Sequence, residues 1–117
     1  MEESVLKTVK KILGIEPTYD EFDIDIITHI NAVFVVLQQL GVGPKTGFMI
    51  TGNTEKWTDF IEDTTVLNMV KSYMYAKVRM AFDPPVQSGV KESLNEIIKE
   101  YEWRLNAAVD PEGTFTD

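Results

Sequence analysis

The sequence predicts an all-α protein with a single domain, folded as a bundle of about four helices. Four segments of the 117-residue chain repeat apolar residues at steps of three and four positions, the spacing of one helix face. Glycines and prolines separate these segments, and the length suits one hydrophobic core. We expect a helical domain over residues 1–108. The acidic end, residues 109–117, is interrupted by proline and glycine and is expected to be a flexible tail.

The first predicted helix covers residues 4–13, with Ser4 as its N-cap and Gly14 as its stop signal. Its apolar stripe faces away from three lysines. These are Lys7, Lys10 and Lys11. The lysines form either a solvated face that suits the negative end of the helix dipole or a contact for an acidic partner. The sequence leaves both interpretations open.

The second predicted helix is the central one, and Gly41 closes it. Three aspartates, Asp20, Asp23 and Asp25, lie near its N-terminus, where the helix dipole favours anions. Its apolar stripe consists of Ile26, Ile27, Ile30, Val33, Phe34, Leu37 and Leu40. The many β-branched residues would also suit a strand, but the length and the spacing of the run favour a helix.

A glycine-rich loop follows over residues 41–57 and surrounds a short apolar run. Its four glycines and one proline predict irregular backbone, with room for a small hairpin. The glycine spacing departs from that of a phosphate-binding loop, so we do not expect nucleotide binding. Long loops in compact domains are often contact elements. The interface candidates here are Lys45, Phe48, Met49 and Ile50.

A short helical turn capped by Thr54 comes next and is expected to bury Trp57, Phe60 and Ile61. The long helix after it covers residues 64–82, and its Tyr75 and Arg79 are spaced to contact each other. Its apolar stripe consists of Leu67, Val70, Tyr73, Met74, Val78 and Ala81.

The last predicted helix begins at a Ser88 cap and runs to about Ala108. Its apolar stripe consists of Val90, Leu94, Ile97, Ile98, Tyr101, Leu105 and Ala108. The opposite face carries Glu92, Glu96, Lys99, Glu100 and Glu102. This helix therefore presents an acidic surface on the side away from the core.

The corner between the last two helices reads "RMAFDPPVQSGV". Residues before prolines are pushed into extended conformations, so Asp83, Pro84 and Pro85 must end the preceding helix. We expect Phe82 to fill the gap between the two helices and Asp83 to bond nearby backbone amides. The corner needs no reaction chemistry, and its tip exposes Gln87 and Ser88 as contact candidates.

The residues that could carry a reaction, considered one by one, argue against an enzyme. The chain has no cysteine, and its one histidine, His29, has only Asp25 as a nearby helical partner, which is an incomplete metal site. We interpret His29 as a structural or surface residue. Adjacent acids such as Glu62 and Asp63 point to different sides of a helix, and the serines lack a nucleophile-elbow context. We expect no catalytic residue, no cofactor and no bound metal.

Charge and hydropathy limit the class of partner. A net charge of −8 argues against general affinity for nucleic acid, although an acidic wall would let DNA pass without holding it. The N-terminal segment lacks the apolar core of a signal peptide, and no apolar run has the length of a membrane span. We expect a soluble protein made in the cytoplasm, with no membrane contact.

The series "GVGPKTGFMITG", "WTDF", "VKSYMYAKVRMAFDPPVQSGV" and "YEWRLN" resembles tailed-phage head-tail connector (adaptor, or head-completion) proteins, encoded in phages and prophages of Gram-positive bacteria. The resemblance covers residues 5–108, and "KVRMAFDPP" with the downstream "EWRLN" is its most specific part. It implies a helical bundle that assembles as a ring, commonly of twelve subunits, beneath the portal protein. The ring would extend the DNA channel and hold a stopper or tail-completion protein, without catalysis or cofactor.

This resemblance implies a location in the host cytoplasm during assembly and in the virion neck afterwards. An alternative is another small helical phage interaction protein, such as a tail-completion factor, packaging accessory or regulator. Under the connector interpretation the charge split could supply a subunit contact, with the three lysines of the first helix against the acidic last helix. The tail, with Phe115 as its aromatic residue, is a further partner candidate.

Overall fold

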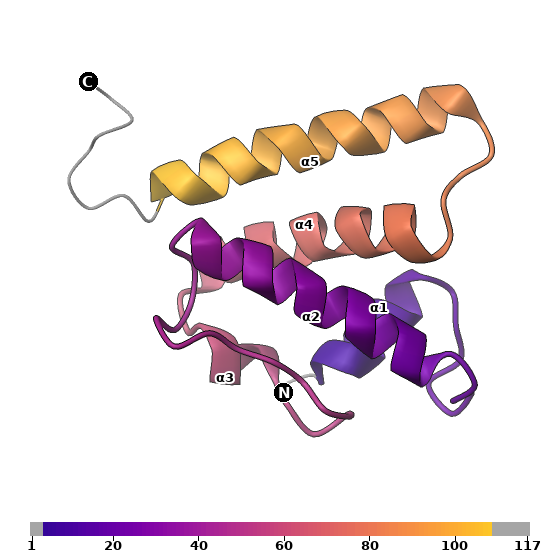
Figure 1. The fold of residues 1–117 in the computed structure, drawn as a ribbon, viewed down its shortest axis with the longest axis horizontal. Coiled ribbons are helices and arrows are strands. Elements are labelled where there is room, and N and C mark those ends of the chain that lie inside the picture. Colours follow the sequence, from indigo (N-terminus) through magenta and orange to yellow (C-terminus); the bar gives the residue numbers. More distant parts are fainter. Residues whose placement is uncertain (1–3, 109–117) are drawn as a thin grey trace.

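The computed structural model describes residues 4–108, and five α-helices account for most of them (Figure 1). Their bounds are α1 Val5–Ile12, α2 Asp23–Gln39, α3 Trp57–Phe60, α4 Thr64–Phe82 and α5 Ser88–Ala108. Over this range there is no strand, only an isolated antiparallel bridge between Ser4 and Lys56. The predicted all-α class is confirmed, whereas the glycine-rich loop does not form a hairpin. The predicted tail lies outside the described residues.

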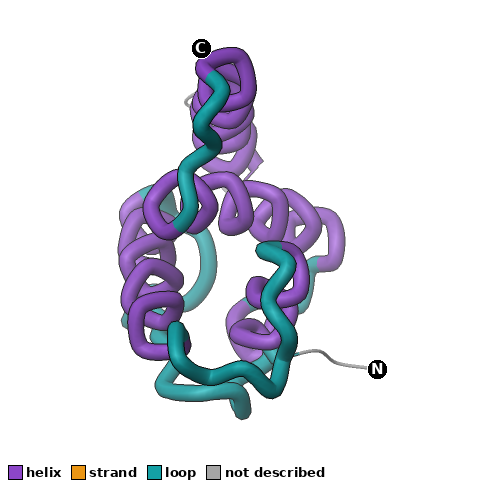
Figure 2. Tube along the Cα trace, turned by 90° about the vertical axis from the view of Figure 1, so that its right-hand side faces the viewer, coloured by secondary structure: helices purple, strands orange, loops and turns teal. Residues whose placement is uncertain are grey.

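Helix α4 is the element against which the other long helices pack. It contacts α5, α2 and α1, and α1 and α2 also contact each other. Figure 2 shows α1, α2 and α4 around one interior, with α5 standing away from α1 and meeting the body at α4. The buried core residues of the three body helices are Val5, Leu6, Val9, Ile26, Ile30, Val33, Phe34, Leu37, Val66, Leu67, Val70, Tyr73, Met74 and Val78.

Lys10 is buried at the junction of α1, α2 and the loop between them. Its exposed fraction is 1%, and its ammonium donates hydrogen bonds to the carbonyl oxygens of Pro17 at 3.0 Å and Tyr19 at 2.6 Å. The same ammonium forms an ion pair with Asp23 Oδ1 at 2.8 Å. That oxygen is buried and takes no hydrogen bond from the residues described, so the ion pair offsets its burial. The ammonium thus has two hydrogen-bond acceptors and one ion partner around it.

Glycines end α1 and α2 in the same way, as predicted. Gly14 and Gly41 have φ angles of +83° and +89°, a region that glycine enters without steric cost. The residues that follow them donate backbone hydrogen bonds back into the last turn. Ile15 N–H reaches the Lys10 carbonyl and Val42 N–H reaches the Leu37 carbonyl, each at 2.8 Å. These bonds satisfy carbonyls that a helix end would otherwise leave unpaired.

Helix α5 buries fewer side chains than the body helices α1, α2 and α4 do. Only Leu94 and Leu105 are buried among its described side chains. Polar contacts help to attach it: the Tyr73 hydroxyl donates to Glu102 Oε2 at 2.7 Å, and Asn106 Nδ2 donates to the Leu40 carbonyl at 2.8 Å. Burial, followed by the hydrogen bond and the charge of Glu102, raises the pKa of Tyr73. The hydroxyl therefore stays protonated as a donor at neutral pH.

The corner after α4 differs from its prediction in two ways. Phe82 does not fill the gap to α5, because its ring meets Phe22 edge-on at 5.4 Å and so packs toward the start of α2. Ser88 is the first residue of α5 rather than its cap, since Lys91 N–H bonds the Gln87 carbonyl. The predicted contact of Arg79 with Tyr75 is confirmed, with Arg79 Nη1 donating to the Tyr75 hydroxyl at 3.1 Å.

Replacing Lys10 should test the buried junction. Lys10→Met keeps the aliphatic length but leaves Asp23 without its ion partner, so we expect a loss of about 3 kcal/mol in unfolding free energy. Lys11→Met is the matched control, because Lys11 is exposed on the same helix, and should change the stability by less than about 0.5 kcal/mol. Urea denaturation of both variants measures the difference. Equal midpoints would show that the Lys10 ion pair contributes nothing to stability.

Candidate interaction surfaces

A group of lysines meets on one side of the body, where α1 lies beside the loop that precedes α3. Lys7 and Lys11 are exposed and lie one turn apart on α1, and Lys56 joins them from that loop. They line a cavity of about 400 Å³ that we call the basic cradle. Its residues are Ser4, Lys7, Thr8, Lys11, Pro17, Asn53 and Lys56. Like charges four residues apart destabilise a helix, and an anionic partner would offset this repulsion.

The prediction that Lys10 shares an exposed face with Lys7 and Lys11 is wrong. Its ammonium turns inward to the Pro17 and Tyr19 carbonyls, so it cannot meet a partner in this conformation. The cradle instead gains Lys56, which the sequence pattern did not associate with α1. A backbone hydrogen bond from Val5 N–H to the Glu55 carbonyl at 3.0 Å brings these distant segments together. That pairing has no periodic signal in the sequence.

Helix α5, which lies on the other side of α4 from α1, carries an acidic stripe (Figures 1 and 2). We define it as Glu92, Glu96 and Glu100, which are exposed and spaced four residues apart. Lys99 is exposed beside it, and Arg104 Nε donates to Glu100 Oε2 at 2.7 Å. Glu102 was expected on this face, but it is half-buried and bonds Tyr73. Glu100 is thus paired with Arg104, whereas Glu92 and Glu96 are the carboxylates of the stripe that take no part in this ion pair.

The glycine-rich loop is anchored from within. Ile50 is buried, and the Asn31 side chain on α2 bonds both its carbonyl at 3.0 Å and its N–H at 2.8 Å. Phe48 is half-buried, with its ring 5.0 Å from that of Phe34. These two interface candidates therefore serve mainly as anchors. Lys45 and Met49 remain exposed, the latter by 64%.

Glu55 closes the base of this loop. The Thr51 N–H and hydroxyl each donate to Glu55 Oε2 at 2.9 Å, and Gly52 N–H donates to Oε1 at 3.4 Å. Desolvation by itself raises the pKa of Glu55, but the hydrogen bonds outweigh it and leave the pKa below its ordinary value. A lowered pKa means that these bonds support the fold while Glu55 is ionised. Their support is lost as the pH falls through that lowered pKa.

The corner between α4 and α5 forms an exposed tip. Gln87 and Ser88 are exposed, and Val86 exposes 96% of its surface. Pro85 is buried beneath them, so the tip stands on a fixed base. Arg79 Nε donates to the Asp83 carbonyl at 2.9 Å and ties the corner to the last turn of α4. Phe115, the remaining interface candidate, lies outside the described residues.

The sequence offered one histidine, His29, with Asp25 one turn before it on α2. His29 meets the Phe82 ring edge-on at 6.4 Å, and no bond to Asp25 is found in the described part of the chain. Residues 4–108 contain no group of three or more side chains that could hold a metal ion. None of the helices described is long and apolar enough to cross a membrane.

A family described as phage connector protein matches residues 5–112 of the chain. Neither a curated protein nor a solved structure matches this chain. The match spans all five helices, the charged residues of both surfaces and the glycine-rich loop.

Two glycines of the loop allow a matched test of its packing. A Cβ at Gly43 would overlap the Phe60 ring, and Gly43 has a φ of +88°. We expect Gly43→Ala to cost about 3 kcal/mol of unfolding free energy through strain and overlap. A Cβ at Gly52 meets nothing within 4 Å, so Gly52→Ala should stay within about 0.5 kcal/mol of the parent. Thermal denaturation compares them, and equal melting temperatures would contradict the packing described.

Proposed function

Because the chain belongs to the phage connector protein family, we propose that it is a head-tail connector (adaptor) subunit that forms a ring under the portal. The observation that carries this proposal is the family match over residues 5–112. A phage connector is a structural protein of the virion neck and interacts with other head and tail proteins. In the proposed role the ring extends the DNA channel and holds the next stopper or tail-completion protein. This work requires no catalysis and no cofactor.

Two surfaces of opposite charge support a head-to-tail ring. A cyclic assembly uses heterologous contacts, in which one patch of each subunit meets a different patch of its neighbour. Lys7 and Lys11 of the basic cradle belong to α1 and the acidic stripe belongs to α5, and α1 and α5 lie on different sides of α4 (Figure 1). In the proposal, Lys7 and Lys11 of one subunit meet Glu92 and Glu96 of the next. Charge complementarity of this kind sets register and partner choice more than it adds affinity.

The charge of the chain suits passage of DNA through the ring. At −8, the subunit carries a large excess of carboxylates. Carboxylates facing a channel repel the phosphate backbone, and DNA can then move without being held. We propose that the DNA passes without specific binding.

The exposed loops are the proposed docking elements for the portal and for the next neck protein. Lys45 and Met49 project from the anchored glycine-rich loop, and Gln87 and Ser88 form the tip between α4 and α5. The segment 109–117, with Phe115, is a third element. In the proposal the subunit folds in the host cytoplasm and takes its place in the neck during assembly.

Charge reversal tests the subunit contact. Lys7→Glu with Lys11→Glu should reduce assembly on the portal at least tenfold, because each cradle then repels the acidic stripe of its neighbour. Lys10 is left unchanged, since its burial would confound the result with unfolding. Native mass spectrometry of the chain mixed with its portal measures how many subunits bind.

Two further variants control this experiment. Lys91→Glu with Lys99→Glu changes the net charge equally but adds acid to α5, and should not reduce assembly. Adding Glu92→Lys and Glu96→Lys to the cradle reversal exchanges both surfaces and should restore assembly. If the exchanged variant assembles no better than the cradle reversal alone, these two surfaces are not partners.

Removing the segment 109–117 tests its role in docking. The body packs through residues 4–108, so the shortened chain should keep its melting temperature while its affinity for the portal falls at least tenfold. Calorimetric titration and thermal denaturation measure the two quantities. An unchanged affinity would remove the segment from the docking surface, and a collapsed melting temperature would place it in the core.

A further inference from the structure

A long stretch of the chain carries almost no charge. Between Asp25 and Glu55 the only aspartate, glutamate, lysine or arginine is Lys45, although 26% of the whole chain is charged. This stretch forms most of α2 and the glycine-rich loop. Depletion of charged side chains distinguishes the buried centre of a protein–protein interface from the rest of a surface. The exposed part of this stretch is therefore a candidate for burial in a complex.

One side of α2 and the loop beside it present this stretch to the outside. Ile24 and Val35 are exposed by 80% and 49%, and Val35 lines a cavity together with the exposed Met49 of the loop. We call this surface the neutral face. Its residues are Ile24, Thr28, Asn31, Val35 and Gln38, which share one side of α2 by their spacing, and Met49.

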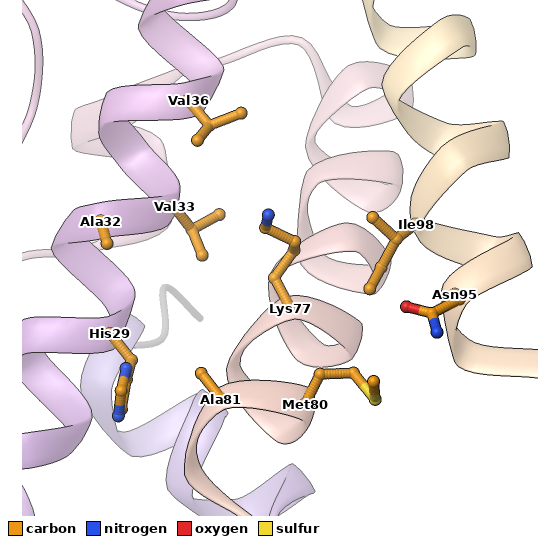
Figure 3. A pocket seen from close by; sticks show the side chains of 9 residues that line it. All are labelled: His29, Ala32, Val33, Val36, Lys77, Met80, Ala81, Asn95 and Ile98. Carbon is orange, nitrogen blue, oxygen red and sulfur yellow. The ribbon is translucent and has the colours of Figure 1, made fainter. Parts of the chain in front are cut away.

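The opposite side of α2 is apolar as well. There Val33 and Val36 point into the groove between α2 and α5, which has α4 as its floor (Figure 3). A helix that is apolar on most of its sides is normally buried on those sides. In the single subunit this holds for the side toward α4 but not for the neutral face, which lacks a cover.

The polar side chains of the neutral face use their hydrogen bonds inside the chain. Thr28 Oγ1 donates to the Ile24 carbonyl at 2.9 Å, and Asn31 bonds an N–H and a carbonyl of the loop backbone. Gln38 Nε2 donates to the Lys45 carbonyl at 2.9 Å. A partner that covers these groups removes few hydrogen bonds to water, so the cost of burying them is small.

Opposite charges lie at the two ends of the neutral face. Asp25 is exposed in the first turn of α2, three residues before Thr28. Lys45 is exposed at the other end, where its backbone bonds Gln38. The helix rises about 20 Å from Asp25 to Gln38. A second α2 helix that runs antiparallel, about a two-fold axis near Asn31, therefore brings the acidic end of each face onto the basic end of the other.

We propose that the neutral face binds a second copy of this chain through a two-fold contact between antiparallel α2 helices. In this contact Val35 of each copy meets Thr28 of the other, and Asp25 of each copy pairs with Lys45 of the other. Both copies use the same face, so the contact closes after two subunits. Two nearly neutral faces also meet without the repulsion that the net charge of −8 creates between other parts of the surface.

The two-fold contact is separate from the head-to-tail contact of the proposed ring, which uses α1 and α5. It shares Lys45 and Met49 with the loop that we propose as a docking element, so a subunit docked through that loop releases its second copy. The dimer is thus the state of the free chain. Its failure would leave the connector role untouched, and a failure of the ring would leave the dimer untouched.

Sedimentation velocity of the purified full chain, from micromolar to millimolar concentration, tests the dimer. One helix face makes a small interface, so we expect a reversible monomer–dimer equilibrium within this range. Val35→Glu should weaken dimerisation at least tenfold, because it buries a carboxylate in an apolar contact. Val86→Glu is the matched control, since Val86 is exposed at the tip between α4 and α5, and it should leave dimerisation unchanged. Thermal denaturation verifies that both variants fold.

Charge exchange tests the antiparallel register. Asp25→Lys should weaken the dimer at least threefold, because the new lysine meets Lys45 of the other copy, and Lys45→Asp should do the same by placing two acids together. The double variant exchanges both ends and should restore the dimer. A double variant that dimerises no better than either single variant would overturn the proposal.

Three other results would also contradict the two-fold contact. The first is a chain that stays monomeric up to millimolar concentration. The second is growth beyond two copies, because an isologous contact cannot extend. The third is a monomeric chain whose Val35→Glu variant loses affinity for the portal, which would assign the neutral face to the portal.

Discussion

The buried ammonium of Lys10 is the interaction on which the arrangement of the body depends. It donates hydrogen bonds to two carbonyl oxygens of the loop between α1 and α2, and it forms an ion pair with Asp23 at the start of α2. An uncompensated ammonium in the interior would be costly, so the loop must pass close to α1 and α2 must begin where it does. With these elements in place, Phe22 meets Phe82 and fixes the end of α4. Arg79 Nε, which donates to the Asp83 carbonyl, ties the corner that follows to the same turn of α4.

The body and α5 contribute differently to the molecule. The body helices share one core, whereas α5 rests on α4 with two buried side chains and the Tyr73 and Asn106 hydrogen bonds. The lighter attachment leaves one face of α5 for charge and one side for the groove toward α2. The proposed ring places the charged face between subunits.

The helices and their ends could be predicted because their signals are local. Apolar spacing located the four long helices, and glycines at positions 14 and 41 marked two ends whose positive φ angles confirm them. The burial of Lys10 could not be predicted, since its partners are carbonyls that a loop brings together only in three dimensions. The same limit applies to Lys56, which reaches the cradle through backbone pairing, and to Ile50, which Asn31 holds from another element. Contacts between distant segments leave no period in the sequence.

Electron microscopy of the purified chain mixed with its portal protein tests the connector role most directly. The account predicts a closed ring of subunits on the lower face of the portal, coaxial with its channel. In such a ring the α1 side of each subunit should face α5 of its neighbour. A portal without added density would contradict the account, as would subunits bound singly with no contact between them.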